Sequence, residues 1–233
     1  MVKSETAEPS GQPNRPLTDI AYEQLEERIV TLQLPPGSAL SEGALVRALG
    51  IGRTPVREAL QRLAREGLVA ILPRRGIVVS GIDAARQLEL LLLRREVERL
   101  MASLAAERAS ESERERFRAI AAGMRDAARR NDDVQFMRLD SELNALLAAA
   151  CRNEYVRRAM ALMAGLSRRF WYRHYREVSD LPLCARLHAD LADAAGAGGV
   201  PAAAAASDRL MDYVERFTSA SLEAASDPST SSG

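Results

Sequence analysis

SEGALVRALGIGRTPVREALQRLAREGL, residues 41–68, is the stretch that decides the fold of this chain. It contains two short segments with apolar residues at helical spacing, joined at Gly50-Ile51-Gly52. The second segment opens with Arg53-Thr54-Pro55, and proline is well tolerated in the first turn of a helix. Two short helices around a tight turn predict a helix-turn-helix, so double-stranded DNA is the first partner to consider.

Positive charge is concentrated around the second of these helices. The whole chain has 32 basic and 32 acidic residues and a formal net charge of zero. The segment 53–75 contains six arginines and two glutamates, and six minus two gives it a net charge of +4. This local surplus lies where a negatively charged duplex would be held.

Residues on either side of the opening stretch complete the predicted domain. A helix capped by Thr18 and ended by Pro35-Pro36-Gly37 precedes it. Ser41 is the expected N-terminal cap of the second helix and Gly50 its C-terminal stop, and the third helix begins near Arg53.

Two apolar runs after the third helix predict a β-hairpin. They are residues 68–72 and 77–79, and the intervening Pro73-Arg74-Arg75-Gly76 forms a basic tip. Three helices and a two-stranded hairpin make a winged helix-turn-helix domain, which we place at residues 17–80.

The candidate DNA-contacting residues lie on the third helix and on the hairpin tip. A helix enters the major groove with its first turns, where Arg can bind guanine and Thr a phosphate or a thymine methyl. Arg62 suits a phosphate contact or, alternatively, an intrahelical pair with Glu66. The tip would meet the minor groove or the flanking backbone. The candidates are Arg53, Thr54, Pro55, Arg57, Arg62, Arg74, Arg75 and Gly76. One small module buries little surface, so we expect a homodimer on a palindromic operator.

Long helices without strands follow from residue 83 onward. The pattern predicts helices near 83–109, 111–130, 132–151, 153–176, 179–195 and 201–224. Short breaks between them favour antiparallel neighbours. The predicted fold class is therefore mainly α, with an N-terminal winged helix-turn-helix and a C-terminal all-α helical bundle over residues 83–224.

The remaining segments and the composition set further limits. Residues 1–16 and 226–233 are polar and predict disordered tails. No segment resembles a signal peptide or is apolar for the roughly 20 residues that span a bilayer, so we expect a cytoplasmic protein without a membrane partner. Cys151 and Cys184 are interpreted as ordinary thiols.

The N-terminal part resembles a known family. The resemblance is to the DNA-binding domain of GntR-type bacterial transcription regulators, and it covers about residues 17–80. It implies that Arg53, Thr54, Arg57 and Gly76 touch operator DNA. Gly43 stands where many members have a basic DNA-contacting residue, a role that Arg47 could replace. The motifs that carry it are Pro35-Pro36-Gly37, Leu40-Ser41-Glu42, Leu49-Gly50-Ile51, Arg53-Thr54-Pro55-Val56-Arg57-Glu58-Ala59-Leu60 and Glu66-Gly67-Leu68-Val69.

Residues 83–224 resemble the FCD-type helical domain of the FadR subfamily. The resemblance implies a small-molecule effector, often a carboxylate, and a regulatory role in a dimer. The residues it assigns to the effector site are Arg94, Asp140, Asn144, His188 and Tyr213. Arg94 is the candidate clamp for a carboxylate, with a salt bridge to Glu98 as its alternative role.

The same resemblance raises a divalent metal as a candidate cofactor. Many FCD members bind a metal through an Asp, a His four residues later and two further His. Here Asn144 replaces the first His, and Tyr213 or Val214 replaces the last, depending on how the segment 196–201 is aligned. Asp140 and His188 remain as candidate metal ligands. No cofactor is expected with certainty.

Three functions compete. The leading hypothesis is a transcription regulator, most often a repressor in this family, whose operator affinity changes when an organic acid binds the bundle. The alternative is a DNA-binding regulator with a vestigial, ligand-independent helical domain. An enzyme is disfavoured, because the sequence shows no nucleophile with a base, phosphate-binding loop or paired catalytic carboxylates.

Overall fold

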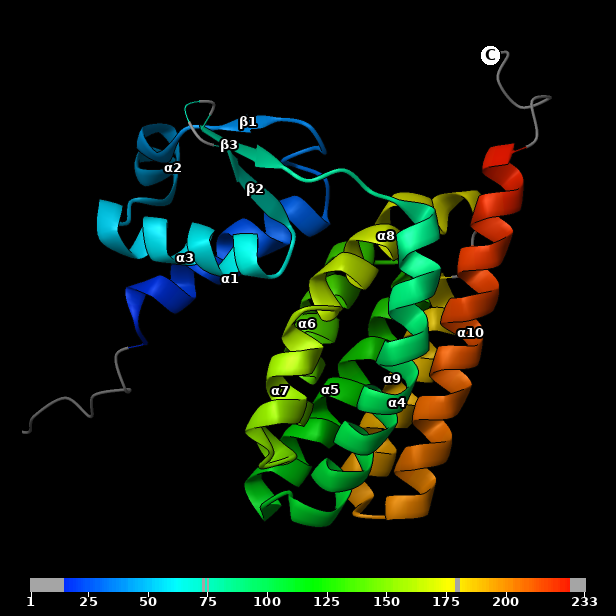
Figure 1. Ribbon diagram of the computed structural model, residues 1–233. Coiled ribbons are helices and arrows are strands. Elements are labelled where there is room, and N and C mark those ends of the chain that lie inside the picture. The colour runs from blue at the N-terminus through cyan, green and yellow to red at the C-terminus, as the bar shows by residue number, and fades with distance from the viewer. Residues whose placement is uncertain (1–14, 73, 75, 179–180, 227–233) are drawn as a thin grey trace, which may run out of the picture.

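The computed structural model describes residues 15–72, 74, 76–178 and 181–226, in two parts (Figure 1). We call residues 17–79 the head and residues 84–226 the bundle. The fold class predicted from the sequence is confirmed, since the head carries a small sheet and the bundle consists of helices. The predicted tails, 1–16 and 226–233, lie outside the described residues except for residues 15, 16 and 226.

The head contains three helices and a small antiparallel sheet. Its strands run in the order β1-β3-β2, with Leu40 opposite Ile77 and Leu72 opposite Gly76. The predicted hairpin is present, but the third strand was missed because two residues are too short to show an alternating pattern. The elements are α1 (Leu17–Val30), β1 (Ala39–Leu40), α2 (Glu42–Leu49), α3 (Arg53–Arg65), β2 (Val69–Leu72) and β3 (Gly76–Val79).

Local signals explain most of the helix boundaries in the head. Ser41 Oγ accepts a hydrogen bond from the Ala44 amide, and Gly50 ends α2 in the left-handed conformation with a φ of 65°. Both predictions are confirmed. The prediction that Thr18 caps α1 is wrong, because α1 begins at Leu17 and the Thr18 hydroxyl donates instead to Glu58 of α3.

The bundle contains the longer helices. The prediction of one helix over 153–176 is wrong, because the chain turns at Leu162 and Met163 and begins a new helix. The turn is held by short-range bonds from the Leu162 and Met163 amides to the carbonyls of Ala159 and Met160. The helices are α4 (Ala84–Arg108), α5 (Glu111–Arg130), α6 (Asp133–Ala150), α7 (Glu154–Ala161), α8 (Ala164–Val178), α9 (Leu181–Ala197) and α10 (Val200–Ser226).

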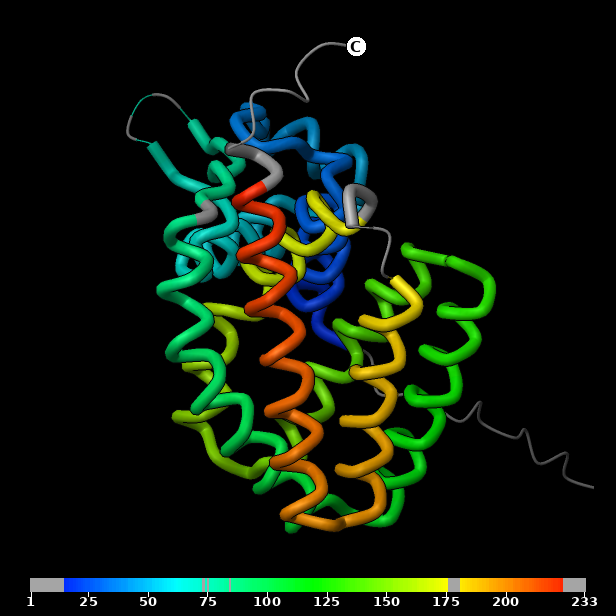
Figure 2. The backbone as a smooth tube through the Cα atoms, turned by 90° about the vertical axis from the view of Figure 1, so that its right-hand side faces the viewer, coloured from blue at the N-terminus to red at the C-terminus, as the bar shows by residue number. Residues whose placement is uncertain are grey.

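Four long helices of the bundle lie side by side. Figure 2 shows them in the order α4, α10, α9, α5, and α6 packs against both α4 and α5. The core between them is made of fully buried side chains such as Phe117, Met124, Leu210 and Met211. No helix among the described residues is long and apolar enough to cross a membrane.

Helix α8 joins the bundle to the head. Leu166 of α8 packs against the core of the head, and the two Nη groups of Arg169 donate to the carbonyls of Ser80 and Gly81 in the connecting segment. Gly165 allows the close approach, because a Cβ at this position would lie 2.8 Å from Leu68 Cδ1. The start of α8 is therefore shared between the two parts of the molecule.

Candidate nucleic-acid interface and ligand cavity

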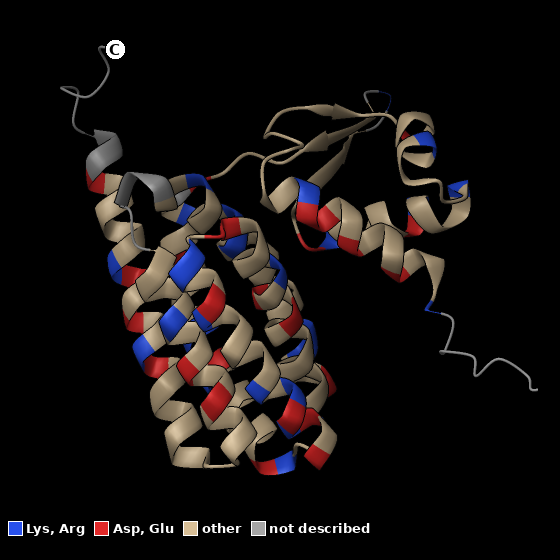
Figure 3. Ribbon diagram, turned by 180° about the vertical axis from the view of Figure 1, so that it is seen from behind, with Lys and Arg blue, Asp and Glu red and all other residues tan. Residues whose placement is uncertain are grey.

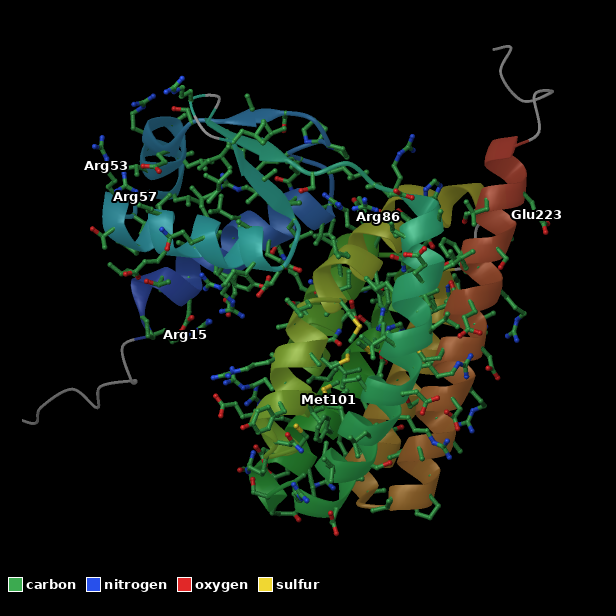
Figure 4. All side chains as sticks on the ribbon, viewed as in Figure 1. Arg15, Arg53, Arg57, Arg86, Met101 and Glu223 are labelled. Atoms are coloured by element: carbon green, nitrogen blue, oxygen red, sulfur yellow. The ribbon has the colours of Figure 1, made fainter. Side chains whose placement is uncertain are left out.

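The first turns of α3 present the predicted recognition residues to solvent. Arg53, Thr54 and Arg57 are exposed, whereas Val56 and Leu60 on the opposite side of α3 are buried in the head. Figure 4 shows Arg53 and Arg57 at the end of α3 that lies far from the bundle. Pro55, the fourth predicted residue here, is partly exposed in the first turn.

Arg57 is oriented by α2. Its Nε and Nη2 donate to the Glu42 carboxylate at 3.3 and 3.0 Å, and these hydrogen bonds lower the pKa of Glu42. Gly43 stands where many family members have a basic DNA-contacting residue. A Cβ added at Gly43 would lie 3.7 Å from Arg47 Nη1, so the exposed guanidinium of Arg47 lies beside this position. Arg53 also acts on Glu42 and lowers its pKa, so Arg47, Arg53 and Arg57 lie together where α2 and α3 meet.

Arg62 has a different environment from the other predicted contacts. Its guanidinium lies over the Tyr22 ring at 3.6 Å and pairs with Glu66 at 3.1 Å and with Asp19 at 3.7 Å. Tyr22 and Asp19 belong to α1. The Arg62 side chain therefore lies against α1 and away from the exposed first turns of α3. The pair with Glu66, which the sequence analysis left as the alternative role of Arg62, is present in the structure.

The wing is the turn between β2 and β3. Gly76 has a φ of 85°, a conformation that L side chains rarely adopt, and Arg74 reaches 64°. Both are exposed. Arg75, also predicted to contact DNA, lies outside the described residues. Figure 3 shows basic residues at the end of the head that lies far from the bundle, whereas acidic and basic residues are mixed along the rest of the head helices and along the bundle.

A small cavity in the bundle brings together three of the five predicted effector-site residues. Arg94, Asp140 and His188 line it, and its volume is about 30 Å³. Its wall also contains aromatic and apolar side chains from α6, α8 and α10. These further lining residues are Phe136, Met137, Trp171 and Val214.

The other two predicted effector-site residues lie elsewhere. Asn144 lines a cleft between the head and the bundle and donates to Asp140 Oδ1 at 2.9 Å. The Tyr213 hydroxyl accepts a hydrogen bond from Trp171 Nε1 at 3.0 Å, and Val214, the alternative to Tyr213 in the sequence analysis, lines the cavity. These two residues were predicted to line the same site from their spacing in the sequence. Whether side chains meet depends instead on which face of each helix they occupy.

Asp140 lies next to both a guanidinium and an imidazole in the cavity. Arg168 Nε donates to its Oδ2 at 2.7 Å, and His188 Nε2 lies 3.4 Å from its Oδ1. His188 Nδ1 lies 2.8 Å from the Cys184 carbonyl, which can only accept, so Nδ1 carries a proton. Asp140 is thus neutralised by a guanidinium within the protein.

These residues do not fit a divalent metal. A metal site needs several free donors, but the Asp140 carboxylate is bonded to Arg168 and Asn144, and Tyr213 is bonded to Trp171. Within the described part of the chain, no three His, Cys, Asp or Glu side chains come together as a metal site.

Arg94 and Arg168 are the buried cations of the cavity wall. Arg94 Nε donates to Glu98 Oε2 at 2.6 Å, which is the salt bridge considered from the sequence. The effector-site residues expected from the sequence did not include Arg168, and they did not include Glu26 of α1, which bonds to Arg168. Nothing in the local pattern around Glu26 distinguishes it from an exposed helical glutamate.

A winged helix-turn-helix with exposed arginines, joined to a helical bundle with a polar cavity, defines a DNA-binding transcription regulator. Residues 17–79 match the model of bacterial regulatory proteins of the gntR family, and residues 89–213 match the FCD domain. The chain belongs to the GntR family of transcription regulators, in the group with an FCD domain, and its class is that of regulators and not of enzymes.

Individual relatives agree with this assignment. A transcriptional regulator in an unstable DNA locus of Streptomyces ambofaciens is 47% identical over 92 residues, which are 40% of this chain but only 38% of the relative. The transcriptional repressor RspR of Escherichia coli is 28% identical over 186 residues, 80% of this chain and 82% of that protein.

Solved structures show the same fold. Escherichia coli McbR/YncC has a TM-score of 0.73 at 18% identity, over 89% of this chain and 99% of that chain. A GntR regulator from Rhodococcus sp. RHA1 has a TM-score of 0.63 at 24% identity, over 89% and 98%.

Proposed function

We propose that this chain is an effector-responsive repressor that binds a palindromic operator as a homodimer in the bacterial cytoplasm. The observation that carries the proposal is the exposed start of α3, where Arg53, Thr54 and Arg57 project from a helix whose other face is buried. These residues, with Arg47, Arg74 and Gly76, form the proposed DNA contacts. RspR, which this chain resembles over most of its length, is named a repressor.

A second copy of the chain is the proposed partner in the dimer. Helix α4 exposes large apolar side chains, with Leu92 at 73%, Leu93 at 58% and Leu100 at 48% exposure. Covering such side chains is favourable by about 25 cal/mol per Å² of apolar area. Two heads brought together in this way would read two half-sites of one operator.

The cavity around Asp140 is the proposed effector site. Two buried arginines, Arg94 and Arg168, line it together with Trp171 and Phe136. Guanidinium groups bind carboxylates with two parallel hydrogen bonds, and aromatic walls accept the apolar part of an organic acid. A small carboxylate is therefore the effector class that this chemistry supports.

The DNA-binding part of the proposal is tested by fluorescence anisotropy. The operator is first selected from a random pool of duplexes, and the full chain is then titrated with it and with a scrambled duplex. Arg57→Ala should weaken operator binding about 5- to 150-fold and the scrambled duplex much less, because a base contact is worth about 1–3 kcal/mol. Arg74→Ala should weaken both duplexes similarly.

The matched control is Arg129→Ala, which removes an exposed arginine of α5 in the bundle. It should leave both affinities unchanged. Equal losses on operator and scrambled duplex for Arg57→Ala would remove Arg57 as a base reader, and the absence of any preferred duplex would overturn the proposed function.

The size of the cavity favours one alternative. About 30 Å³ holds only about one or two water molecules. A regulator with a vestigial helical domain would keep this cavity closed. Thermal-shift measurements with organic acids separate the two, since a ligand of the folded state raises the melting temperature and a vestigial domain shows no shift.

A further inference from the structure

A buried series of charged groups connects the cavity of the bundle with the head. Its centre is Arg168 on α8, whose side chain is 7% exposed. Besides the bond from Nε to Asp140, Nη2 donates to the Met137 carbonyl at 2.6 Å and Nη1 donates to Glu26 Oε1. Asp140 belongs to the cavity wall, whereas Glu26 belongs to α1 of the head. One guanidinium therefore holds both parts of the molecule.

Arg168 also separates two spaces. On one side is the small cavity around Asp140, and on the other is the cleft between head and bundle, with a volume of about 330 Å³. Arg168 lines both, and Glu26 lines the cleft. The cleft has the size of a small-molecule site, whereas the cavity does not. A ligand that reaches the cavity from the cleft has to move Arg168.

The guanidinium of Arg168 cannot pair with a further anion while both of its carboxylate partners remain bound. Glu26 and Asp140 supply two carboxylates around one guanidinium, and both are buried. A ligand carboxylate can bind Arg168 only if one of the two leaves, because unpaired buried charges are strongly unfavourable. Asp140 is also bonded by Asn144.

Glu26 is the carboxylate that can leave. Burial raises the pKa of Glu26, which means that its charged form is held less well than in water. The cleft gives its side chain a path to solvent, and its helix, α1, belongs to the head and not to the bundle.

We propose that a small organic carboxylate enters through the cleft and replaces Glu26 on the guanidinium of Arg168, which releases α1 of the head from α8. This inference rests on the proposed effector response and names the residue at which effector and head compete. The release changes the position of the recognition helix, because α3 packs on α1. By linkage, whatever weakens the Glu26 bond strengthens ligand binding by the same factor.

The test compares two glutamates that are neighbours in the sequence. Glu26→Gln removes the competing charge, whereas Glu27→Gln is the matched control, because Glu27 forms an exposed ion pair across the same boundary with Arg138 of α6. Binding of acetate, succinate and citrate to the full chain is measured by isothermal titration calorimetry. Glu26→Gln should bind at least one of these acids about 5-fold or more tightly than wild type. Glu27→Gln should bind within about twofold of wild type.

A second measurement uses the wild-type protein and does not depend on the variants folding. Hydrogen exchange of the amides in residues 17–30 is followed with and without the acid that binds. Saturating acid should speed exchange in α1, because the bond that holds it to α8 is lost. Glu26→Gln should show the faster exchange without any acid.

Two failures are distinguishable. If an acid binds all three proteins equally, or binds without changing exchange in α1, competition at Arg168 is wrong while the effector response stands. If none of the three acids binds any of the proteins, although operator binding is intact, the effector response itself is overturned and the competition with it.

Discussion

Arg57 and Arg62 lie five residues apart on α3, and their surroundings differ completely. Arg57 projects into solvent and is oriented by Glu42 from α2. Arg62 lies on the face that packs against α1, where it covers the Tyr22 ring and pairs with the buried Glu66. Five residues along one helix therefore separate an exposed arginine, the proposed DNA contact, from one that packs against α1.

Replacement of Arg62 should therefore affect stability and not operator recognition. Arg62→Ala removes the contact with Tyr22 and leaves the Glu66 carboxylate with one partner fewer. We expect a loss of about 1–3 kcal/mol in the free energy of unfolding, measured by urea denaturation. The ratio of operator to scrambled affinity should stay at the wild-type value. A fall in that ratio at full stability would return Arg62 to the set of base-reading residues.

At the scale of single residues, the sequence was informative wherever a side chain is exposed. Apolar spacing on α3 places Val56 and Leu60 inward, and it follows that Arg53 and Arg57 point outward. For Arg62 the spacing left two roles open, since its partner Tyr22 comes from α1, 40 residues earlier in the chain. Sequence spacing within one helix cannot show which face a second helix covers.

At the scale of elements, α8 is the part of the chain with most influence on the site. It begins after the turn at Leu162 and Met163, docks against the head through Gly165 and Leu166, and places Arg168 at the cavity. The first turns of α8 thus contact both the head and the cavity. Any change in the position of α8 affects both.

Gly165 tests how tightly α8 is docked. Gly165→Ala places a Cβ 2.8 Å from Cδ1 of the fully buried Leu68, so one of the two parts has to shift. We expect a net loss of about 1–2 kcal/mol in the free energy of unfolding, because overpacking outweighs the gain in helix propensity.

The matched control is Gly43→Ala in α2, where the nearest atom to an added Cβ is 3.7 Å away. Its stability should equal or slightly exceed that of wild type. If Gly165→Ala were as stable as this control, the contact between α8 and Leu68 would be looser than the structure indicates.

At the scale of the whole molecule, a buried carboxylate links the stability of the protein to pH. Burial is the largest cause that raises the pKa of Glu26, followed by the opposing effect of Arg168 and by repulsion from Asp140, Glu66 and Glu27. Glu26 therefore binds a proton more readily in the folded state than in the unfolded chain. Its contribution to stability is fully present below the ordinary glutamate pKa and is lost as the pH rises through the folded value.

The difference in unfolding free energy between wild type and Glu26→Gln isolates this contribution. The difference, wild type minus variant, should be larger at pH 5 than at pH 8, as measured by urea denaturation at each pH. A difference that is constant or grows with pH would show that Glu26 is held as a carboxylate without penalty.

The sequence by itself determined the two-part, mainly helical fold, the boundaries of α2 and α3, and the outward face of the recognition helix. These follow from local causes, namely the Ser41 cap, the left-handed Gly50 and the spacing of apolar residues. The tertiary structure alone decided that Asp140 pairs with Arg168 and that Glu26 reaches across to the bundle. Those contacts join residues from α1, α6 and α8, and their geometry depends on how whole helices pack, which no local pattern encodes.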